Sequence, residues 1–599
     1  WAPDGKRIVY SSYLGRQWHQ LWLTHIDNLA EPFPLTYGSF DVTAARWSPD
    51  GKRIAYIANE NGNLEIRVQD FVGGKVSKLR ADVRSYLQPM ATLDLSVIAS
   101  NDLPLAARVA IVAADGRSYA PDTAWVHADD SFDRDKSKRE AQYFHVDGTV
   151  RITLPAGAAR VTIWRGPEYA IAQDDIKLEA DRANKLTVTM QRLPLPASWN
   201  TQVGGDVHVH MNYGGTYRAT PQSLIAQAAA EDLDVVFNLL VNKEQRVPDI
   251  AYFSAQADEA STRNTLLLHS QENHTSFWGH LGILGLKSHL LVPDYSAYPY
   301  TGAASLFPDN TTVATLAREQ GATIGYVHPF LSPPPDPAKD AKLTNALPID
   351  AALGLVDYYE VIGFADHRAS AEVWYGLLNC GMRIAAAGGT DAMSNYASLR
   401  GPVGINRTYV PLADVPTDPE QRRDNWLAGL KAGKSVATNG PLLGLTVEGY
   451  GPGAEITRGT GEHELKYAGY LRSAVPVDHL ELVHNGKVVK SFKLDRARRS
   501  ADISGTVAVE GSGWLLLRAW NDKADPLVFD LYPYASTSPV YVTVNGERPR
   551  SARDADYFLA WIGRVREGVM AHADYNDDSE RPTILGHLAD AERVYRACR

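Results

Sequence analysis

Hydrophobic and polar residues alternate with two different rhythms along this chain. Between residues 201 and 440, short apolar runs alternate with amphipathic stretches that open at a capping residue and close at glycine. Helices are predicted to begin at Thr220-Pro221, Asn310 and Ser370. Strands that alternate with helices predict parallel β/α units, of which about eight can close into a barrel. The predicted strands are 206–210, 234–240, 265–269, 282–286, 323–327, 358–362 and 383–387.

The segments on either side of this region have the two-residue alternation of β-strands. Residues 81–200 and 441–550 each alternate short apolar strands with turns, and Asn485-Gly486 is a hairpin signal. Both segments are predicted to be β-sandwiches. Residues 551–599 instead have a helical apolar stripe and are predicted to form a helical tail. The stripe consists of Tyr557, Leu559, Ile562 and Val565.

The N-terminal segment, residues 1–80, contains a repeat. The sequence Trp-Ala-Pro-Asp-Gly-Lys-Arg-Ile-Val-Tyr at residues 1–10 recurs with small changes at residues 47–56, 46 positions later. Pro-Asp-Gly favours a tight turn, and the apolar residues after it favour a strand. The repeat resembles the blades of TolB-like β-propellers, with two unrelated hairpins as the alternative. A propeller needs about four to eight blades, so we expect further blades upstream or from partner chains.

Composition narrows the class of protein. Of the 599 residues, 44% are hydrophobic and 22% charged, which excludes a disordered chain. The sequence has no run of 18 apolar residues, so we expect no membrane span. The net charge of −10 argues against nucleic acid as a partner. Two cysteines, Cys380 and Cys598, are too few for a disulfide framework or a cysteine-based zinc module.

Polar residues typical of metal ligands lie at the ends of the central strands. His208 and His210 are two apart on one strand, so both imidazoles lie on one face. Each residue also has an ordinary explanation, such as a turn histidine or a helix cap, but together they predict a site on one rim. Imidazole and carboxylate suit one or two divalent ions, with Zn favoured and Mn or Fe as alternatives. The remaining candidates are Glu272, His280, His328 and Asp391.

Residues 204–440 resemble the PHP (polymerase and histidinol phosphatase) superfamily of metal-dependent hydrolases, in its carbaryl-hydrolase-like branch. The resemblance rests on residues 205–210, Glu272 with residues 279–286, His328-Pro329 and residues 383–391. It implies a distorted, TIM-like β/α barrel with metal ions in its mouth. It also implies that His208, His210, Glu272 and Asp391 hold one ion, and that Glu272 bridges to a second ion held by His280 and His328.

The chain departs from that family pattern in two places. It has Leu240-Val241-Asn242 where the family often has an Asp-His pair, and Met393 where a histidine is common. One or two ions are therefore expected rather than three. The resulting fold class is multidomain, with a β/α barrel flanked by β-sandwiches and a partial propeller.

These residues predict a hydrolase in which metal-activated water cleaves an amide, ester or carbamate bond of a small molecule. Asp391 is the candidate for proton transfer, with a purely ligating role as the alternative, and Glu272 is the shared carboxylate. His274 is a candidate donor to the leaving group or a loop histidine. The candidate substrate contacts are Asn242, His367, Arg368 and Arg400, each with a structural or solvated role as its alternative.

Two rival functions remain open from the sequence. The first is a phosphoesterase that uses the same metal site, and the second is a non-catalytic, metal-containing binding protein. Assays with aryl acetate, aryl carbamate and aryl phosphate would distinguish the phosphoesterase from the acyl hydrolase. Metal analysis would distinguish the binding protein from the hydrolase. The association of TolB-like blades with such a hydrolase favours a periplasmic or secreted protein, and a homo-oligomer is left open.

Overall fold

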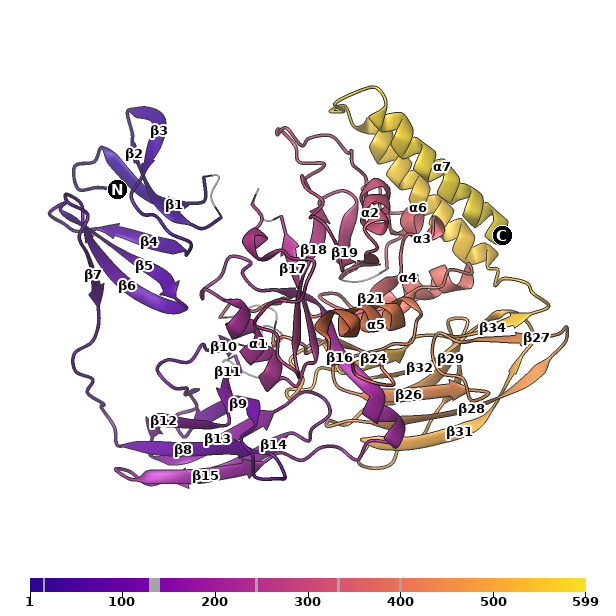
Figure 1. The fold of residues 1–599 in the computed structure, drawn as a ribbon, viewed down its shortest axis with the longest axis horizontal. Coiled ribbons are helices and arrows are strands. Elements are labelled where there is room, and N and C mark those ends of the chain that lie inside the picture. The colour runs from indigo at the N-terminus through magenta and orange to yellow at the C-terminus, as the bar shows by residue number, and fades with distance from the viewer. Residues whose placement is uncertain (15–16, 129–139, 243–245, 331–333, 398–400) are drawn as a thin grey trace.

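The structure is a computed structural model that describes residues 1–14, 17–128, 140–242, 246–330, 334–397 and 401–599 (Figure 1). It is built mainly from β-sheets, with few helices. None of the described helices is both long and apolar enough to cross a lipid bilayer.

The N-terminal repeat forms two small antiparallel sheets, in the orders β1-β2-β3 and β4-β5-β6-β7. The Pro-Asp-Gly turns before β1 and β5 place Gly5 and Gly51 at φ of +68° and +70°, a conformation that glycine adopts without strain. Each copy of the sequence repeat therefore forms a tight turn followed by a β-strand. Its strands are β1 Arg7–Ser12, β2 Gln20–His25, β3 Asn28–Pro34, β4 Val42–Trp47, β5 Arg53–Asn61, β6 Asn63–Asp70 and β7 Val76–Leu79.

Two further sheets enclose one core between residues 90 and 189. Their orders are β10-β11-β9-β13-β14 and β12-β8-β15. On β8, Ala91, Leu93, Leu95 and Val97 are buried in that core, because alternate residues of a strand face the same side. The strands are β8 Met90–Ile98, β9 Ala106–Ala113, β10 His127–Ala128, β11 Gln142–Asp147, β12 Thr149–Pro155, β13 Gly157–Trp164, β14 Ala172–Leu178 and β15 Ala183–Thr189.

The central sheet has the order β22-β21-β20-β19-β18-β17-β16. Its strands are β16 Gln202–His210, β17 Val235–Val241, β18 Leu266–Thr275, β19 Gly279–Leu284, β20 Thr323–Tyr326, β21 Tyr358–Ile362, β22 Ala385–Gly388 and, after it, the short β23 Ala392–Met393. The helices of this region are η1 Ala197–Thr201, α1 Pro221–Ala230, η2 Ile250–Tyr252, α2 Asn310–Glu319, α3 Leu347–Ala352, α4 His367–Asn379 and α5 Pro419–Lys431.

The central sheet differs from the expected parallel barrel, and no closed barrel is found among the described residues. Strand β19 is antiparallel to both β18 and β20. Only residues 276–278 join β18 to β19, too few for the crossover that parallel pairing needs. On its other side, β16 pairs antiparallel with β24 (Arg407–Pro411), so the sheet continues into the C-terminal region.

A two-residue parallel ladder pairs the short strand β23, which follows β22, with β16. In it, Val209 is opposite Ala392 and His210 is opposite Met393. The backbone N–H of Asp391 also donates to the carbonyl of His208 at 2.8 Å. The segment after β22 therefore lies directly against the end of β16.

The helices begin at side chains that accept backbone hydrogen bonds. Thr220 caps α1 through a bond from the N–H of Ser223, as expected. Helix α4 begins at His367 rather than at Ser370, because Asp366 accepts the N–H of Ala369 at 2.8 Å.

The C-terminal β-structure has two layers around a second large core. One layer is β26-β28-β31, and the other continues the central sheet through β25-β33-β32-β29-β30. Asn485 and Gly486 form the predicted turn, with φ of +49° and +78°. The strands are β25 Val436–Thr438, β26 Leu442–Val447, β27 Glu455–Arg458, β28 His463–Arg472, β29 His479–His484, β30 Lys487–Ser491, β31 Ser500–Val509, β32 Gly513–Trp520, β33 Tyr534–Thr537 and β34 Val540–Val544.

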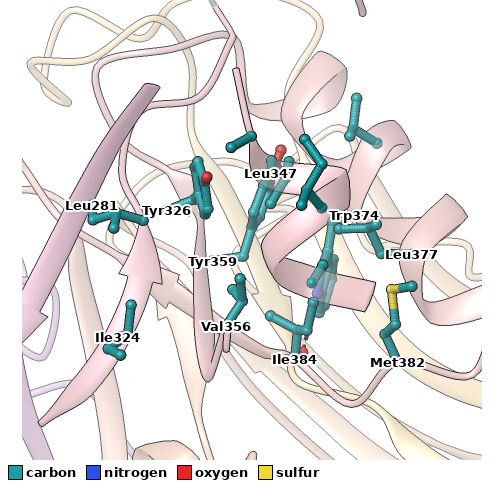
Figure 2. Close-up of a cluster of buried hydrophobic side chains, with 14 of the residues drawn as sticks. Leu281, Ile324, Tyr326, Leu347, Val356, Tyr359, Trp374, Leu377, Met382 and Ile384 are labelled. Carbon is teal, nitrogen blue, oxygen red and sulfur yellow. Dashed lines mark hydrogen bonds between the residues drawn. The ribbon is translucent and has the colours of Figure 1, made fainter. Parts of the chain in front are cut away.

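The C-terminal tail is a hairpin of two helices, α6 Ala552–Ala571 and α7 Glu580–Cys598, drawn in yellow in Figure 1. It completes the largest hydrophobic core, in which side chains of β19, β20, β21 and α4 meet (Figure 2). Trp561 of α6 donates its indole N–H toward the carbonyls of Thr344 and Asn345, both at 3.1 Å. The tail therefore supports the loop that leads into α3.

Candidate metal centre

Six side chains with metal-ligating atoms meet at one end of the central strands. Three groups of three ligand atoms each lie within 4.8 Å of one another. Each side chain comes from a strand of the central sheet or from the residues that follow one. These residues are His208 and His210 of β16, Glu272 of β18, His280 of β19, His328 after β20 and Asp391 after β22.

The imidazoles of His208 and His210 both lie close to one oxygen of Glu272 and to one oxygen of Asp391. The Nε2 atoms of His208 and His210 are 3.1 Å apart. The Nε2 of His208 is 3.5 Å from Oε2 of Glu272 and 3.4 Å from Oδ1 of Asp391. The Nε2 of His210 is 3.2 Å from each of the same two oxygens. An ion with tetrahedral bonds of about 2.0–2.1 Å separates its ligand atoms by about 3.3–3.4 Å, so the two imidazoles and Oε2 of Glu272 have the spacing of ligands of one ion.

Hydrogen bonds on the far side of both imidazoles leave their Nε2 lone pairs facing each other. The Nδ1 of His208 lies 3.2 Å from Oε1 of Glu360, and the Nδ1 of His210 lies 2.8 Å from the carbonyl oxygen of Leu239. Each Nδ1 faces an acceptor and therefore carries the hydrogen. At 3.1 Å, the two Nε2 atoms need a proton or a metal cation beside them and the carboxylates.

A second group of three atoms lies beside the first and shares Glu272. The Oε1 of Glu272 is 3.0 Å from Nδ1 of His280 and 3.4 Å from Nε2 of His328. The two imidazole nitrogens are themselves 3.4 Å apart. Oε1 of Glu272 has no hydrogen-bond partner among the described residues although it is buried. The donor set thus suits a second ion, with Glu272 bridging the two.

The carboxylates and imidazoles of the cluster stabilise each other's charges. Burial raises the pKa of Glu272 and Asp391, but the surrounding histidines outweigh it, holding the pKa of Glu272 well below its usual value and that of Asp391 at about 2. Burial lowers the pKa of His210, yet Asp391 and Glu272 raise it to about 9. The carboxylates are therefore ionised at neutral pH, and positive charge at the imidazole nitrogens is stabilised.

Two of the proposed ligands have backbone conformations that are strained for residues other than glycine. His328 has φ of +27° and Asp391 has φ of +57°, a region that side chains rarely adopt. Gly389 precedes Asp391 closely, and a Cβ there would lie 2.3 Å from Oε1 of Glu360 and 2.7 Å from Cβ of His208. Only glycine allows this close approach.

Asp206 links the end of β16 to the segment that contains Asp391 through hydrogen bonds to its carboxylate. Its Oδ1 accepts the N–H groups of His208 at 3.0 Å and Thr390 at 2.9 Å, and its Oδ2 accepts the N–H of Gly404 at 2.8 Å. Burial raises the pKa of Asp206 to about 6. The carboxylate thus positions His208 through its own backbone and Asp391 through the adjacent Thr390.

A cavity of about 480 Å³ opens onto the cluster. Tyr213, Phe364, Val327 and Met393 supply its aromatic and apolar wall, and none of its described lining residues is lysine or arginine. The remaining lining residues are His210, Glu272, His274, Gly279, His280, His328, Pro329, Asn345 and Asp391.

The predicted catalytic residue His274 lines this cavity. The predicted substrate contact Asn242 does not line it. The His274 ring stacks on that of His280, with centroids 3.7 Å apart. Burial, and then the neighbouring His280, lowers the pKa of His274 to about 4. The amide of Asn242 bonds to the backbone of His274 and to the carbonyl of Asp294, so it ties strand ends together. Its contacts do not support a substrate role.

His367 and Arg368 lie elsewhere, at the junction with the C-terminal layers. The buried Nε2 of His367 is 3.1 Å from Oδ2 of Asp530. The guanidinium of Arg368 lies 4.0 Å from the ring centroid of Trp520. Neither residue lines the cavity, and the contacts of both side chains with the C-terminal layers favour a structural role over the predicted substrate role. Arg400 lies outside the described residues.

Glu360 and Asp206 are the residues that sequence reasoning missed. Both are acidic residues within otherwise apolar runs, Tyr-Tyr-Glu-Val-Ile at 358–362 and Gly-Gly-Asp-Val at 204–207. A carboxylate in a buried strand requires partners, and that signal was available in the sequence.

The N-terminal sheets reach the rim of the cavity through Arg246. Its guanidinium donates to the hydroxyl of Tyr13 at 2.9 Å, to the carbonyl of Tyr213 at 3.2 Å and to the carbonyl of Gln17. Because Tyr213 lines the cavity, Arg246 joins the N-terminal repeat to the cavity wall.

Comparison with known proteins yields weak structural likenesses only. No family model matches the chain, and no curated protein matches it. A structure described as TolB from Agrobacterium tumefaciens is 15% identical, covering 33% of this chain and 57% of that one, with a TM-score of 0.14. The Bacillus anthracis TIE protein is 13% identical, covering 28% and 32%, with a TM-score of 0.13. A streptococcal ancillary pilin is 12% identical, covering 31% and 56%, with a TM-score of 0.13.

The chain thus spans between about a third and three fifths of the length of these structures. At such TM-scores the likenesses carry no argument about fold or function. The resemblance to the PHP superfamily remains a hypothesis that rests on the residues of the site.

Proposed function

We propose that this protein is a metal-dependent hydrolase that cleaves an amide, ester or carbamate bond of a small, uncharged molecule. The observation that carries the proposal is the close approach of the Nε2 atoms of His208 and His210, 3.1 Å apart, beside the carboxylates of Glu272 and Asp391. Such a set of buried imidazoles and carboxylates suits zinc, manganese or iron. The adjoining group of Glu272, His280 and His328 supports a second ion.

A divalent ion held there would supply a Lewis acid and would lower the pKa of a water enough for it to act as nucleophile at neutral pH. The chain's own residues bind and orient. Asp391 is ionised and borders the cavity, so it is the carboxylate placed to accept a proton from the attacking water. We assign the hydrogen bond to the leaving group to His274, which lines the cavity beside His280.

The walls of the cavity favour an acyl substrate over a phosphate ester. A phosphoesterase needs positive charge converging on the phosphoryl oxygens. The described lining residues include no lysine or arginine, whereas Tyr213 and Phe364 offer aromatic surface. We therefore infer that the substrate has an apolar or aromatic group next to its carbonyl.

The test combines metal analysis with three parallel assays. The purified protein is analysed for Zn, Mn and Fe by mass spectrometry and assayed with aryl acetate, aryl carbamate and aryl phosphate. We expect at least one equivalent of metal and turnover of the acyl substrates. Phosphate hydrolysis alone would overturn the substrate assignment, and a chain that holds less than about a tenth of an equivalent would favour a binding protein.

The matched variants are His208→Ala with His210→Ala, and His463→Ala as the control. The double variant removes two ligands and should lose both metal and turnover. His463 lies on β28, outside the site, and its loss should change neither. Full activity in the double variant would contradict the proposal.

A further inference from the structure

Asn345 lines the cavity at the candidate metal centre, from the loop just before α3. Its backbone is fixed on two sides, because its N–H donates to the carbonyl of Phe277 at 2.8 Å and its carbonyl accepts the indole N–H of Trp561 at 3.1 Å. Its φ of +81° lies in the left-handed region, where residues other than glycine are strained and often functional. Asn345 is therefore held against the turn that leads to His280.

The side-chain amide of Asn345 has one orientation. Its Oδ1 accepts the N–H of Leu347 at 2.9 Å, and only the oxygen of an amide can accept, so Nδ2 lies on the other side. Gly279 makes room for this group, since a Cβ there would lie 2.6 Å from Nδ2. Both Gly279 and Asn345 line the cavity, and Gly279 directly precedes the proposed ligand His280. The Nδ2 donors thus lie beside the second group of ligand atoms.

These donors have no partner within the described part of the chain and remain accessible. No described residue accepts a hydrogen bond from Nδ2, yet the atom is not among the buried polar atoms that lack a partner. Asn345 as a whole is half-buried. Its Nδ2 therefore keeps surface that a ligand in the cavity can reach.

The other residues of the cavity indicate which acceptor this donor suits. Tyr213 and Phe364 give the wall aromatic surface, and its described lining residues include no lysine or arginine. A neutral N–H group in such a wall suits a neutral oxygen, such as a carbonyl. When water attacks an acyl carbon, negative charge develops on that oxygen, and a donor that is already fixed in place stabilises the charge.

We propose that Asn345 is a substrate-binding residue whose Nδ2 donates a hydrogen bond to the carbonyl oxygen of the bound acyl compound. The proposal rests on the hydrolase function proposed above and adds to it the group that recognises the carbonyl. The hydrogen bond strengthens as negative charge builds up on the oxygen, so Asn345 contributes to turnover as well as to binding.

Two variants of Asn345 test this contact. Asn345→Asp keeps the acceptor for the N–H of Leu347 and replaces the donor by a second oxygen. Asn345→Gly removes the amide without adding a charge, and glycine suits a φ of +81°. We expect kcat/KM for aryl acetate and aryl carbamate to fall about 100-fold in both variants, with the metal content unchanged.

Asn101→Asp is the matched control. The Oδ1 of Asn101 also accepts the N–H of the residue two positions on, Leu103, at 3.4 Å, but in an exposed turn that does not line the cavity. Its kcat/KM should equal that of the wild type. Wild-type kcat/KM in both Asn345 variants, or a loss of activity that follows a loss of metal, would overturn the proposal.

Binding of a compound that cannot be hydrolysed separates this proposal from the hydrolase function. Acetophenone keeps the aromatic ring and the carbonyl, and α-methylstyrene has CH₂ in place of the carbonyl oxygen. By NMR titration, the wild type should prefer the ketone, and that preference should fall about tenfold in Asn345→Gly. An equal preference in both proteins would overturn the role of Asn345. A preference that depends on Asn345 in a protein without acyl hydrolysis would support the carbonyl contact and contradict the hydrolase function.

Discussion

Glu360 lies directly behind His208, with its Oε1 atom 3.2 Å from the Nδ1 atom of that histidine. Its second oxygen accepts the backbone N–H of His328 at 2.7 Å. One buried carboxylate of β21 therefore orients two proposed ligands, one through its ring and one through its backbone. Such outer partners fix the tautomer of a ligating imidazole and raise its basicity.

Replacing Glu360 by glutamine should weaken metal binding without unfolding the protein. Glutamine offers one oxygen where two contacts need acceptors, so either His208 or His328 loses its partner. We expect a loss of metal affinity of about 10- to 100-fold, measured by competition with a chromophoric chelator. Glu372→Gln, on the exposed face of α4, is the control. Unchanged affinity in Glu360→Gln would show that Glu360 does not position the ligands.

Removal of metal should destabilise the wild-type protein and leave the double variant His208→Ala, His210→Ala unaffected. An ion that binds only the folded chain adds about 4 kcal/mol at a thousandfold excess over its Kd. Thermal unfolding with and without EDTA measures the effect. An equal response of both proteins to EDTA would place the bound metal elsewhere.

Asp350 should make stability fall as pH rises toward neutrality. It accepts hydrogen bonds from the hydroxyls of Thr311 at 2.5 Å and Tyr326 at 2.6 Å, and burial raises its pKa from 3.8 to about 7. The folded state thus holds this proton more tightly than the unfolded state. Its stabilising contribution is complete below pH 3.8 and is lost as pH rises through about 7.

Asp350→Asn should remove that loss, which amounts to about 1.4 kcal/mol for each unit of pKa shift. Denaturant unfolding at pH 5 and pH 8 gives the comparison, with the exposed Asp340→Asn as control. The difference between the two pH values should be smaller in Asp350→Asn than in the wild type. A pH dependence identical to that of the wild type would exclude Asp350 as its source.

His367→Ala should affect stability and not substrate binding. The side chains of His367 and Asp530 are both fully buried, and Asn439 also donates to Asp530 at 2.7 Å. Truncation removes one hydrogen-bond partner of the buried Asp530 carboxylate. We expect this to lower the free energy of unfolding by about 1–3 kcal/mol. We expect a lower unfolding temperature with an unchanged KM for an acyl substrate. A raised KM with unchanged stability would restore the substrate role predicted from the sequence.

The sequence by itself determined the local features of this protein. The Pro-Asp-Gly turns, the cap at Thr220 and the strand 358–362 depend on residues a few positions apart, so pattern and turn chemistry were sufficient. The ligand candidates could be named for the same reason: the two-residue period of a strand puts His208 and His210 on one face, and each other candidate lies at or near a predicted strand end.

Only the tertiary structure decided which residues meet. Glu360 and His208 are 152 positions apart, and His367 and Asp530 are 163 apart, so no local pattern could pair them. The direction of β19 likewise followed from the length of its connection to β18, and it replaced the expected parallel barrel with a mixed sheet that runs on into the C-terminal layers. Side-chain roles at such distances are set by packing of the whole chain, because burial gives each polar group a partner wherever the fold supplies one.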